Sequence, residues 1–483
     1  MRLKKRKITK IFKTVFLLTT FLSTATFTTT SCSGLLFQKS ISIVGPNNLS
    51  EEIGMGGKQY YSAIINQNEN AHVNWKLSSK INGINIDNLT GLLEWDSLLE
   101  VGIHKFDIIA SSYQKMNRFE VVLEILPISL NSYVSYIDGL EEKQISLVHS
   151  DIDKLCTTNT FSRFEYEFYN GTVARDKLTG IVFGQDFLSI TSLADKNDFL
   201  RFLFWYSDLT YIDVDLRGLN RVEKIGDGFA MYMFYNCSQL TSLPNYFNLP
   251  RKINIVGEKF ATSMFSHCKN LISLPNNFNL PQDISGLVNT DFTRSMFSHC
   301  ESLTLLPDNF NIPQKITRSE GWFATSMFSN CISLKYLPDN FNIPQGITEV
   351  GELFVYGLFQ SCYSLQYLPN GFSLPETIDS IGDNFAAWMF RYCTSLQYLP
   401  ESFKLPQNIT SVGTNFVSEM FACCSNLKYD GLSTNPLIFP SPQTYGTQFG
   451  YNCFRQATAL INAVSPPLSI NALPGDEIKI ARR

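Results

Sequence analysis

Apolar positions recur in the second half of the chain at a fixed interval, the one that separates Cys237 from Cys268. Between Met233 and Tyr429, seven copies share an apolar pair, two residues, Cys, two residues and Leu, and six of them continue with Leu-Pro and Phe-x-(Leu/Ile)-Pro. A period this strict predicts a solenoid with one coil per copy. The interval is longer by one only between the second and third copies. The central cysteines are Cys237, Cys268, Cys300, Cys331, Cys362, Cys393 and Cys424.

One copy has too small an apolar core to fold alone, so the coils must stack. The Pro after the second Leu cannot donate to a strand ladder, which predicts a short strand ending there. One period before Cys237, the repeat alignment matches Tyr206 with Cys237 and Leu203 with Phe234. Residues 202–232 are therefore predicted to form a degenerate first coil. Residues 449–453 lack the Leu spacing and are interpreted as a closing cap. We therefore place the solenoid at 202–432 and the C-terminal cap and tail at 433–483.

Residues 40–127 alternate apolar and polar positions with period two. Trp75, Phe106 and Val121 lie on such alternations, and about seven short strands fit, which favours an antiparallel sandwich. The Thr90-Gly91 turn and its surroundings resemble bacterial immunoglobulin-like and cadherin-like modules, which usually act as spacers. Residues 128–201 are interpreted as a connector and N-terminal cap region, with one strand expected around Phe164–Phe168.

Residues 1–31 have the pattern of an export signal. They carry seven basic residues and no acidic one, then a short apolar run and small residues ending at Ser31-Cys32. Ser31-Cys32 resembles a bacterial lipobox, although Thr29 stands where Leu is usual. Two interpretations remain open: Cys32 is lipidated, with 32–39 as a tether, or the signal is cleaved and Cys32 has no role. The rest of the chain has 32 basic and 43 acidic residues, a balance that does not favour nucleic acid.

The repeated Met-Phe-x-x-Cys-x-x-Leu-x-x-Leu resembles BspA-type leucine-rich-repeat surface proteins, including the lipoprotein branch common in wall-less bacteria. The resemblance covers about residues 200–460. The copies are longer than the usual family unit, because each carries an added Phe-x-(Leu/Ile)-Pro arm. The resemblance implies a curved surface array that adheres to host cells, matrix proteins or other microbes.

The column five residues after each Cys alternates between Ser, Leu and Tyr, which indicates an exposed position. Its tyrosines predict a ladder that either binds a partner or only shields strand edges. The Lys or Gln directly before each tyrosine would place hydrogen-bond donors along the edge of that ladder. The candidate binding residues are Tyr336, Tyr367, Tyr398, Tyr429, Lys335, Gln366, Gln397 and Lys428.

The seven repeat cysteines are interpreted as buried free thiols, since one small buried residue per coil explains them without a disulfide or a metal. His267 and His299 lie in adjacent copies and could bind zinc together, but the other copies place Asn, Ser or Tyr there, as at a tolerant surface position. Gly54–Gly57 lacks the Lys-Ser/Thr of a phosphate-binding loop and is interpreted as a plain loop. We expect no cofactor and no metal.

The sequence thus predicts a mainly β, lipid-anchored protein on the extracellular face of the cell membrane. An immunoglobulin-like spacer would precede a solenoid of 31-residue coils that binds host or microbial surface proteins or glycans, with no nucleic-acid partner. We find no catalytic motif, and expect no enzyme. The rivals are a structural or antigenic coat protein without a specific ligand, and an enzyme with a site in residues 128–200.

Overall fold

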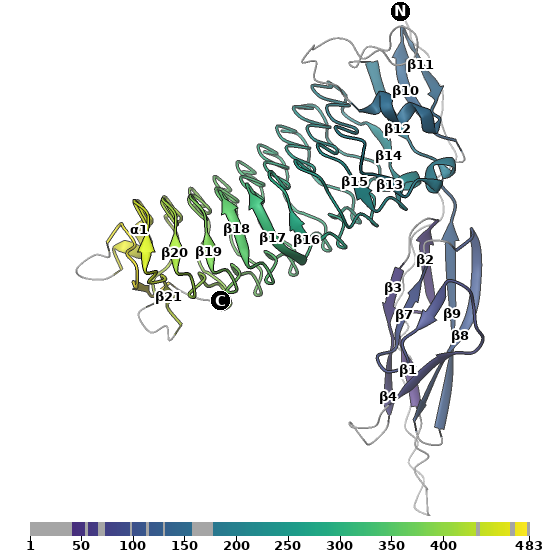
Figure 1. Cartoon of the computed structure of the whole chain (residues 1–483), viewed down its shortest axis with the longest axis horizontal. Coiled ribbons are helices and arrows are strands. Elements are labelled where there is room, and N and C mark those ends of the chain that lie inside the picture. The colour runs from purple at the N-terminus through teal and green to yellow at the C-terminus, as the bar shows by residue number, and fades with distance from the viewer. Residues whose placement is uncertain are drawn as a thin grey trace, which may run out of the picture.

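The structure is a computed structural model that describes residues 41–53, 57–65, 73–96, 99–112, 115–128, 131–156, 177–430, 435–463 and 469–480. The chain is mainly β, with a long solenoid that confirms the repeat architecture predicted from the sequence. Figure 1 shows the N-terminal unit projecting from the N-terminal end of this solenoid. The two parts have separate apolar cores.

The N-terminal unit consists of three small sheets around one core. Its buried side chains include Trp75, Phe106 and Val121, as the period-two pattern predicts. The strands are not all antiparallel, because β2 pairs in parallel with β9. In sheet order the strands are β2 (Asn48–Glu52), β9 (Lys115–Leu126), β8 (Gly102–Ser112) and β5 (Asn74–Leu77); β3 (Gly57–Tyr60), β7 (Leu92–Trp95) and β6 (Ile84–Ile86); and β1 (Ile41–Val44) and β4 (Ser62–Ile65).

The Thr90-Gly91 turn is held by a single carboxylate. Oδ1 of Asp87 accepts hydrogen bonds from the backbone N–H groups of Leu89 and Thr90 and from the Thr90 hydroxyl. These donors, the Thr90 hydroxyl first, lower the pKa of Asp87. Gly91 has a φ of +70°, and a Cβ there would lie 2.6 Å from the Tyr61 carbonyl oxygen, so glycine is required.

The N-terminal end of the solenoid is covered by a hairpin. Strand β10 pairs with β11 on one side and with β12 on the other, and β12 then pairs in parallel with β14. The hairpin therefore closes the first sheet edge of the solenoid. The elements here are β11 (Glu141–Ser146), β10 (Tyr133–Asp138), β12 (Leu178–Val182), β14 (Asp213–Asp215), β13 (Ser192–Leu193), β15 (Lys224–Ile225) and the 3₁₀ helices η1 (His149–Leu155), η3 (Gln185–Ser189) and η4 (Arg217–Leu219).

A six-stranded parallel sheet runs along the solenoid. Its strands follow the Phe-x-(Leu/Ile)-Pro arm, so the short strand predicted before the Leu-Pro pair was misplaced. At the predicted position, successive coils are joined by a single backbone bond, such as that from Gln366 N to the Lys335 oxygen. The strands are β16 (Ser285–Val288), β17 (Lys315–Gly321), β18 (Glu349–Glu352), β19 (Ser380–Ile381), β20 (Ser411–Val412) and β22 (Thr444–Tyr445).

Each coil also contains a run of overlapping turns, which we call the turn ribbon (residues 322–331 in one coil). Within the ribbon, every second N–H bonds three residues back, as Met327 N does to the Ala324 oxygen at 3.1 Å. The intervening N–H groups bond to neighbouring coils, as Ser326 N does to the Tyr356 oxygen at 2.8 Å. This alternation satisfies the backbone but requires positive φ at non-glycine residues, here Trp322, Ala324, Ser326 and Asn330.

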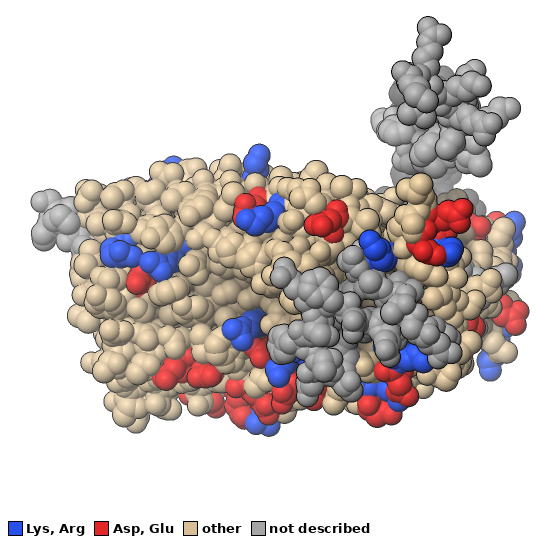
Figure 2. Space-filling view, turned by 90° about the horizontal axis from the view of Figure 1, so that it is seen from above, with Lys and Arg blue, Asp and Glu red and all other residues tan. Residues whose placement is uncertain are grey.

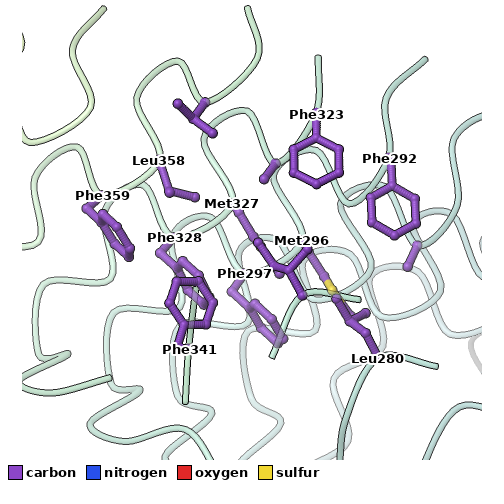
Figure 3. Packing of buried hydrophobic residues seen from close by; sticks show 14 of the residues in the cluster. Leu280, Phe292, Met296, Phe297, Phe323, Met327, Phe328, Phe341, Leu358 and Phe359 are labelled. Atoms are coloured by element: carbon purple, nitrogen blue, oxygen red, sulfur yellow. The ribbon is translucent and has the colours of Figure 1, made fainter. Parts of the chain in front are cut away.

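Three columns of stacked phenylalanine rings fill the core. One column makes eight steps with centroids 5.1–5.9 Å apart and nearly parallel planes. Figure 3 shows Phe297, Phe328 and Phe359 of this column in one row, and Phe292 and Phe323 of a second column in another. Each buried ring contributes about 2–3 kcal/mol of hydrophobic stabilisation, but only when a neighbouring coil covers it. The first column contains Phe204, Phe234, Phe265, Phe297, Phe328, Phe359, Phe390, Phe421 and Phe454.

The added Phe-x-(Leu/Ile)-Pro arm is held by a ladder of asparagines. Oδ1 of Asn311 accepts from Ile312 N in its own coil and from Asn342 N in the next, both at 2.9 Å. Nε2 of Gln314, three residues after Asn311, donates to backbone oxygens of both coils. The repeated Asn-Phe-Asn-(Leu/Ile)-Pro-Gln is the sequence signal of this ladder, but the repeat pattern alone did not predict it. The ladder positions are Asn248, Asn279, Asn311, Asn342 and Ser373.

The first coil differs from the predicted register by one residue. Phe204, not Leu203, stacks on Phe234 at 5.5 Å, so Ser207 takes the place of the cysteine. Further along, the predicted register is correct, because Lys224 bridges Ile255. The difference arises after the turn ribbon, because Tyr211 bridges Ser242 and the segment from Phe204 to Tyr211 is therefore one residue shorter than that from Phe234 to Ser242.

The array also extends further toward the C-terminus than the repeat spacing predicted. Phe454 stacks on Phe421 at 5.9 Å, and Ala457 and Leu460 follow it at the spacing of the repeat Cys and Leu. The Leu spacing is therefore kept after a longer interval, and the array extends beyond residue 432 to the short helix α1 (Thr458–Ile461). The strands β21 (Leu437–Ile438) and β23 (Glu477–Ile478) pair at this end.

Candidate binding surface

Three tyrosines of successive coils form a stacked row, which we call the tyrosine stripe (Tyr336, Tyr367 and Tyr398). The ring centroids of Tyr336 and Tyr367 are 6.3 Å apart, and those of Tyr367 and Tyr398 are 6.4 Å apart. The ring planes differ by only 10° and 15°. Tyr336 is 43% exposed, and the other two are partly buried.

The stacking direction decides what the stripe offers to a partner. Neighbouring rings belong to neighbouring coils, so their faces cover one another along the solenoid axis. The groups left for contact are the ring edges and hydroxyls, together with the outer face of Tyr336. Tyrosine presents such contact area with little side-chain entropy to lose.

The residues before the tyrosines hold the stripe in place. Oε1 of Gln366 accepts a hydrogen bond from the Tyr336 hydroxyl at 3.2 Å. Nζ of Lys428 donates to the Tyr398 hydroxyl at 2.6 Å and lies 4.6 Å from the centre of that ring. Lys335 and Lys428 are exposed, and Gln366 and Gln397 are partly buried. The predicted polar rim therefore lies beside the stripe, and two of its members bond to it.

Tyr429 does not continue the row as predicted. Its backbone pairs with Ile480 of the C-terminal segment, and its side chain packs partly against the solenoid core. At the other end of the stripe, Leu305 is 52% exposed, and Ser273 and Ser242 follow it along the same column. One exposed leucine and two exposed serines thus precede the three stacked tyrosines in this column.

The seven repeat cysteines lie fully buried in one column. Each thiol donates to the backbone oxygen of a phenylalanine in the preceding coil, at 2.9–3.2 Å. Burial raises the pKa of the Cys331 thiol to about 12. It also raises the pKa values of the other repeat thiols at Cys268, Cys300, Cys362, Cys393 and Cys424. Such thiols are poor nucleophiles and serve packing.

His267 and His299 stack face to face, with ring centroids 4.3 Å apart. Partial burial lowers the pKa of both rings, and the neighbouring His299 lowers that of His267 further. Asn330 follows in the same column and lies 3.3 Å from Nε2 of His299. In the described part of the chain, no group of three or more His, Cys, Asp or Glu side chains is placed to hold a metal ion.

Several sequence predictions lie outside the described residues. Cys32, the export signal, Gly54–Gly56 and the strand expected at Phe164–Phe168 are among them. Within the ranges that the structure does describe, no helix has the length and hydropathy of a membrane span.

One face of the molecule carries few charged side chains (Figure 2). Figure 2 shows one face on which Lys, Arg, Asp and Glu are sparse, with acidic residues gathered toward one edge. Several of the charged residues form ion pairs between coils, as Lys269 does with Glu301 at 3.2 Å and Arg318 with Glu349 at 2.7 Å. Exposed pairs of this kind contribute little to stability, about 0–1 kcal/mol each.

Together these features define a leucine-rich-repeat β-solenoid, a class of protein that presents an extended surface. Residues 198–366, 290–435 and 355–471 match the family described as BspA type Leucine rich repeat region, in six copies. The matched spans cover more than half of the chain, which therefore belongs to this family. Repeats of this type are typically non-catalytic and suggest a surface or protein-interaction role. No curated protein and no solved structure matches the chain.

Proposed function

We propose that this protein is a lipid-anchored surface protein whose repeat array adheres to host or neighbouring microbial cells. It binds a surface protein or glycan by contact alone, without catalysis. The observation that carries this proposal is the tyrosine stripe, an ordered and partly exposed aromatic row. Membership in the BspA family supports a surface role.

The N-terminal segments serve export and presentation. Residues 1–31 direct secretion, Cys32 receives the lipid, and 32–39 form a tether. The β unit of residues 40–127 acts as an immunoglobulin-like or cadherin-like spacer that holds the array away from the membrane. Each buried methylene of the lipid supplies about 0.8 kcal/mol, so two or three acyl chains anchor the chain stably on the extracellular face.

Adhesion works through several weak contacts in a row. The ring edges of the stripe supply apolar contact, and the exposed amines of Lys335 and Lys428 supply charged donors. Many copies of the protein on one cell then make binding multivalent, which raises the overall avidity without any new contact.

Binding by the stripe is tested with alanine substitutions in the purified protein. The triple variant Tyr336→Ala, Tyr367→Ala, Tyr398→Ala is expected to lose most of its binding to host cells and matrix proteins. Tyr363→Ala is the matched control, because Tyr363 is 44% exposed but lies outside the stripe. If the triple variant binds as well as the control, the stripe is not the adhesive surface, and a structural or antigenic coat role becomes the better account.

The anchor is tested by metabolic labelling with a palmitate analogue. The native chain is expected to take up label and fractionate with membranes, and Cys32→Ser is expected to lose both properties. An unlabelled native chain would disprove lipidation and favour a simply cleaved export signal.

A further inference from the structure

Two neighbouring residues of the 3₁₀ helix η3 belong to different cores. Phe187 is 1% exposed and packs in the core of the solenoid. Leu188 is 5% exposed and packs in the core of the N-terminal unit, in the cluster that contains Ile53, Ile125 and Ile128. Among the residues that the structure describes after Ile128, Leu188 is the only one in that cluster. The cap of the solenoid therefore inserts one side chain into the other unit.

The helix η3 is held in place from the solenoid side. The ring of Phe187 packs edge to face against His149, with centroids 4.9 Å apart. The Asp186 carboxylate accepts a hydrogen bond from the Ser132 hydroxyl at 2.5 Å, and its backbone oxygen lies 2.7 Å from Nε2 of His149. Because ring, side chain and backbone are all fixed, Leu188 cannot leave the N-terminal unit unless the two units separate.

A second contact between the units is polar and loosely packed. Nη1 of Arg251, on the solenoid, lies 4.0 Å from Oε1 of Glu51, and the Arg251 side chain is 38% exposed. A cavity of about 370 Å³ remains beside it, lined by Trp95 from one unit and by Lys252 and Asp283 from the other. An exposed ion pair next to an open cavity does little to fix an orientation. Of the two contacts, Leu188 is the one that can resist rotation.

We propose that Leu188 is a latch that holds the N-terminal unit at a fixed angle to the array, so that the two units move as one rigid body. Units that touch only through polar surfaces normally rotate relative to one another, whereas a side chain shared with a close-packed core prevents it. Figure 1 shows the N-terminal unit directed across the long axis of the array. The latch therefore presents the side of the array, not its end. That consequence for adhesion rests on the proposed function, but the latch itself does not.

The test measures the distance between the two units in solution. Nitroxide spin labels are attached to the purified full-length protein through Lys105→Cys in the N-terminal unit and Lys335→Cys in the array, both at exposed positions. The background carries Cys32→Ser and Cys156→Ser, since Cys156 is partly exposed while the other cysteines in the described ranges are buried. Pulsed electron paramagnetic resonance is expected to give a single narrow distance distribution.

Leu188→Ala is expected to lose the single narrow peak and to give a broad distribution, because alanine does not reach the core of the N-terminal unit. Leu188→Met keeps an apolar side chain of similar volume and should retain the narrow peak. The matched control is Leu193→Ala, since Leu193 is 2% exposed and lies in the solenoid core alone. It should weaken the cap without broadening the distances.

Three outcomes would overturn the proposal: a broad distribution in the native chain, an unchanged narrow peak in Leu188→Ala, or equal broadening in Leu193→Ala. If circular dichroism shows that Leu188→Ala misfolds, the smaller truncation Leu188→Val is measured in its place against the same outcomes. The triple tyrosine variant should keep the native distance distribution. Failure of the latch therefore leaves the adhesive role of the stripe open, and failure of the stripe leaves the latch intact.

Discussion

The Sγ of Cys331 donates a hydrogen bond to the backbone oxygen of Phe297, one coil earlier, at 3.1 Å. The same oxygen accepts the N–H of Cys300 at 3.0 Å, so both of its lone pairs are used. Cysteine suits this column because it is small, apolar and still a donor. The repeated cysteine therefore links neighbouring coils without a disulfide.

The buried thiols are expected to resist alkylation in the folded protein. At pH 8, a thiol with the pKa of about 12 given for Cys331 is ionised in only about one molecule in ten thousand, against about one in ten for a thiol at its ordinary pKa of 9.0. Ionisation alone thus slows the reaction about a thousandfold, and burial slows it further. Mass spectrometry after iodoacetamide treatment, with and without guanidinium, measures the effect. Rapid alkylation of Cys331 in the native protein would contradict the buried column.

The repeat period predicted the solenoid because every copy carries the same apolar positions. Phe328, Cys331 and Leu334 are buried, as their spacing indicates. The period could not show which part of the coil forms the sheet, because the arm and the Leu-Pro segment are both apolar and both contain proline. The structure assigns the sheet to the segment after the arm, where Val350 and its equivalents alternate with exposed residues.

The candidate surface was predicted in part. Alternation of Ser, Leu and Tyr in one column showed correctly that Tyr336 is exposed, since a packed core would not accept all three. The fate of Tyr429 was not predictable from the repeat, because it depends on Ile480, a residue of the non-repeating tail.

The asparagine ladder is expected to stabilise the arm more than any exposed amide. Asn311→Ala removes the acceptor of two backbone N–H groups at a site that is only 8% exposed, and should lower the free energy of unfolding by about 2–4 kcal/mol. Asn309→Ala is the matched control, because the Asn309 side chain is exposed and only its backbone oxygen is bonded in the ladder. The control should change stability by less than about 0.5 kcal/mol. Equal losses in guanidinium unfolding would show that the ladder is not stabilising.

Two glycines of neighbouring segments, Gly346 and Gly357, should respond to alanine in opposite directions. Gly357 lies in a turn ribbon with a φ of +58°, and a Cβ there would meet Gln360 and Ser326 at 3.2 and 3.3 Å. Gly357→Ala is therefore expected to cost about 1 kcal/mol. Gly346 has open space around its Cβ position and no positive φ, so Gly346→Ala should be neutral or stabilising by up to about 1 kcal/mol. Thermal unfolding of both variants measures the difference, and a stabilising Gly357→Ala would contradict the ribbon geometry.

The stacked histidines are expected to make the solenoid less stable in mild acid. Burial lowers the pKa of His267 and His299 below the ordinary value of 6.5, so the folded state favours their neutral forms. Their contribution to the free energy of unfolding is therefore complete above pH 6.5. It is lost as the pH falls from 6.5 toward the lowered pKa, because in that range the unfolded chain binds protons more readily than the folded chain. Glu301 opposes this shift and Lys269 adds to it, but burial has the largest effect on both rings.

His299→Asn isolates this effect, because asparagine already occupies the same column at Asn236 and Asn330 and tolerates positive φ. Melting temperatures measured from pH 7.5 to 5 should fall less steeply in His299→Asn than in the native chain. The melting temperatures of the two proteins should be most similar near pH 7.5. Parallel curves over the whole range would mean that the stacked pair does not set the acid sensitivity. In that case the loss must come from carboxylates, whose protonation would continue to lower the melting temperature below pH 5 in both proteins.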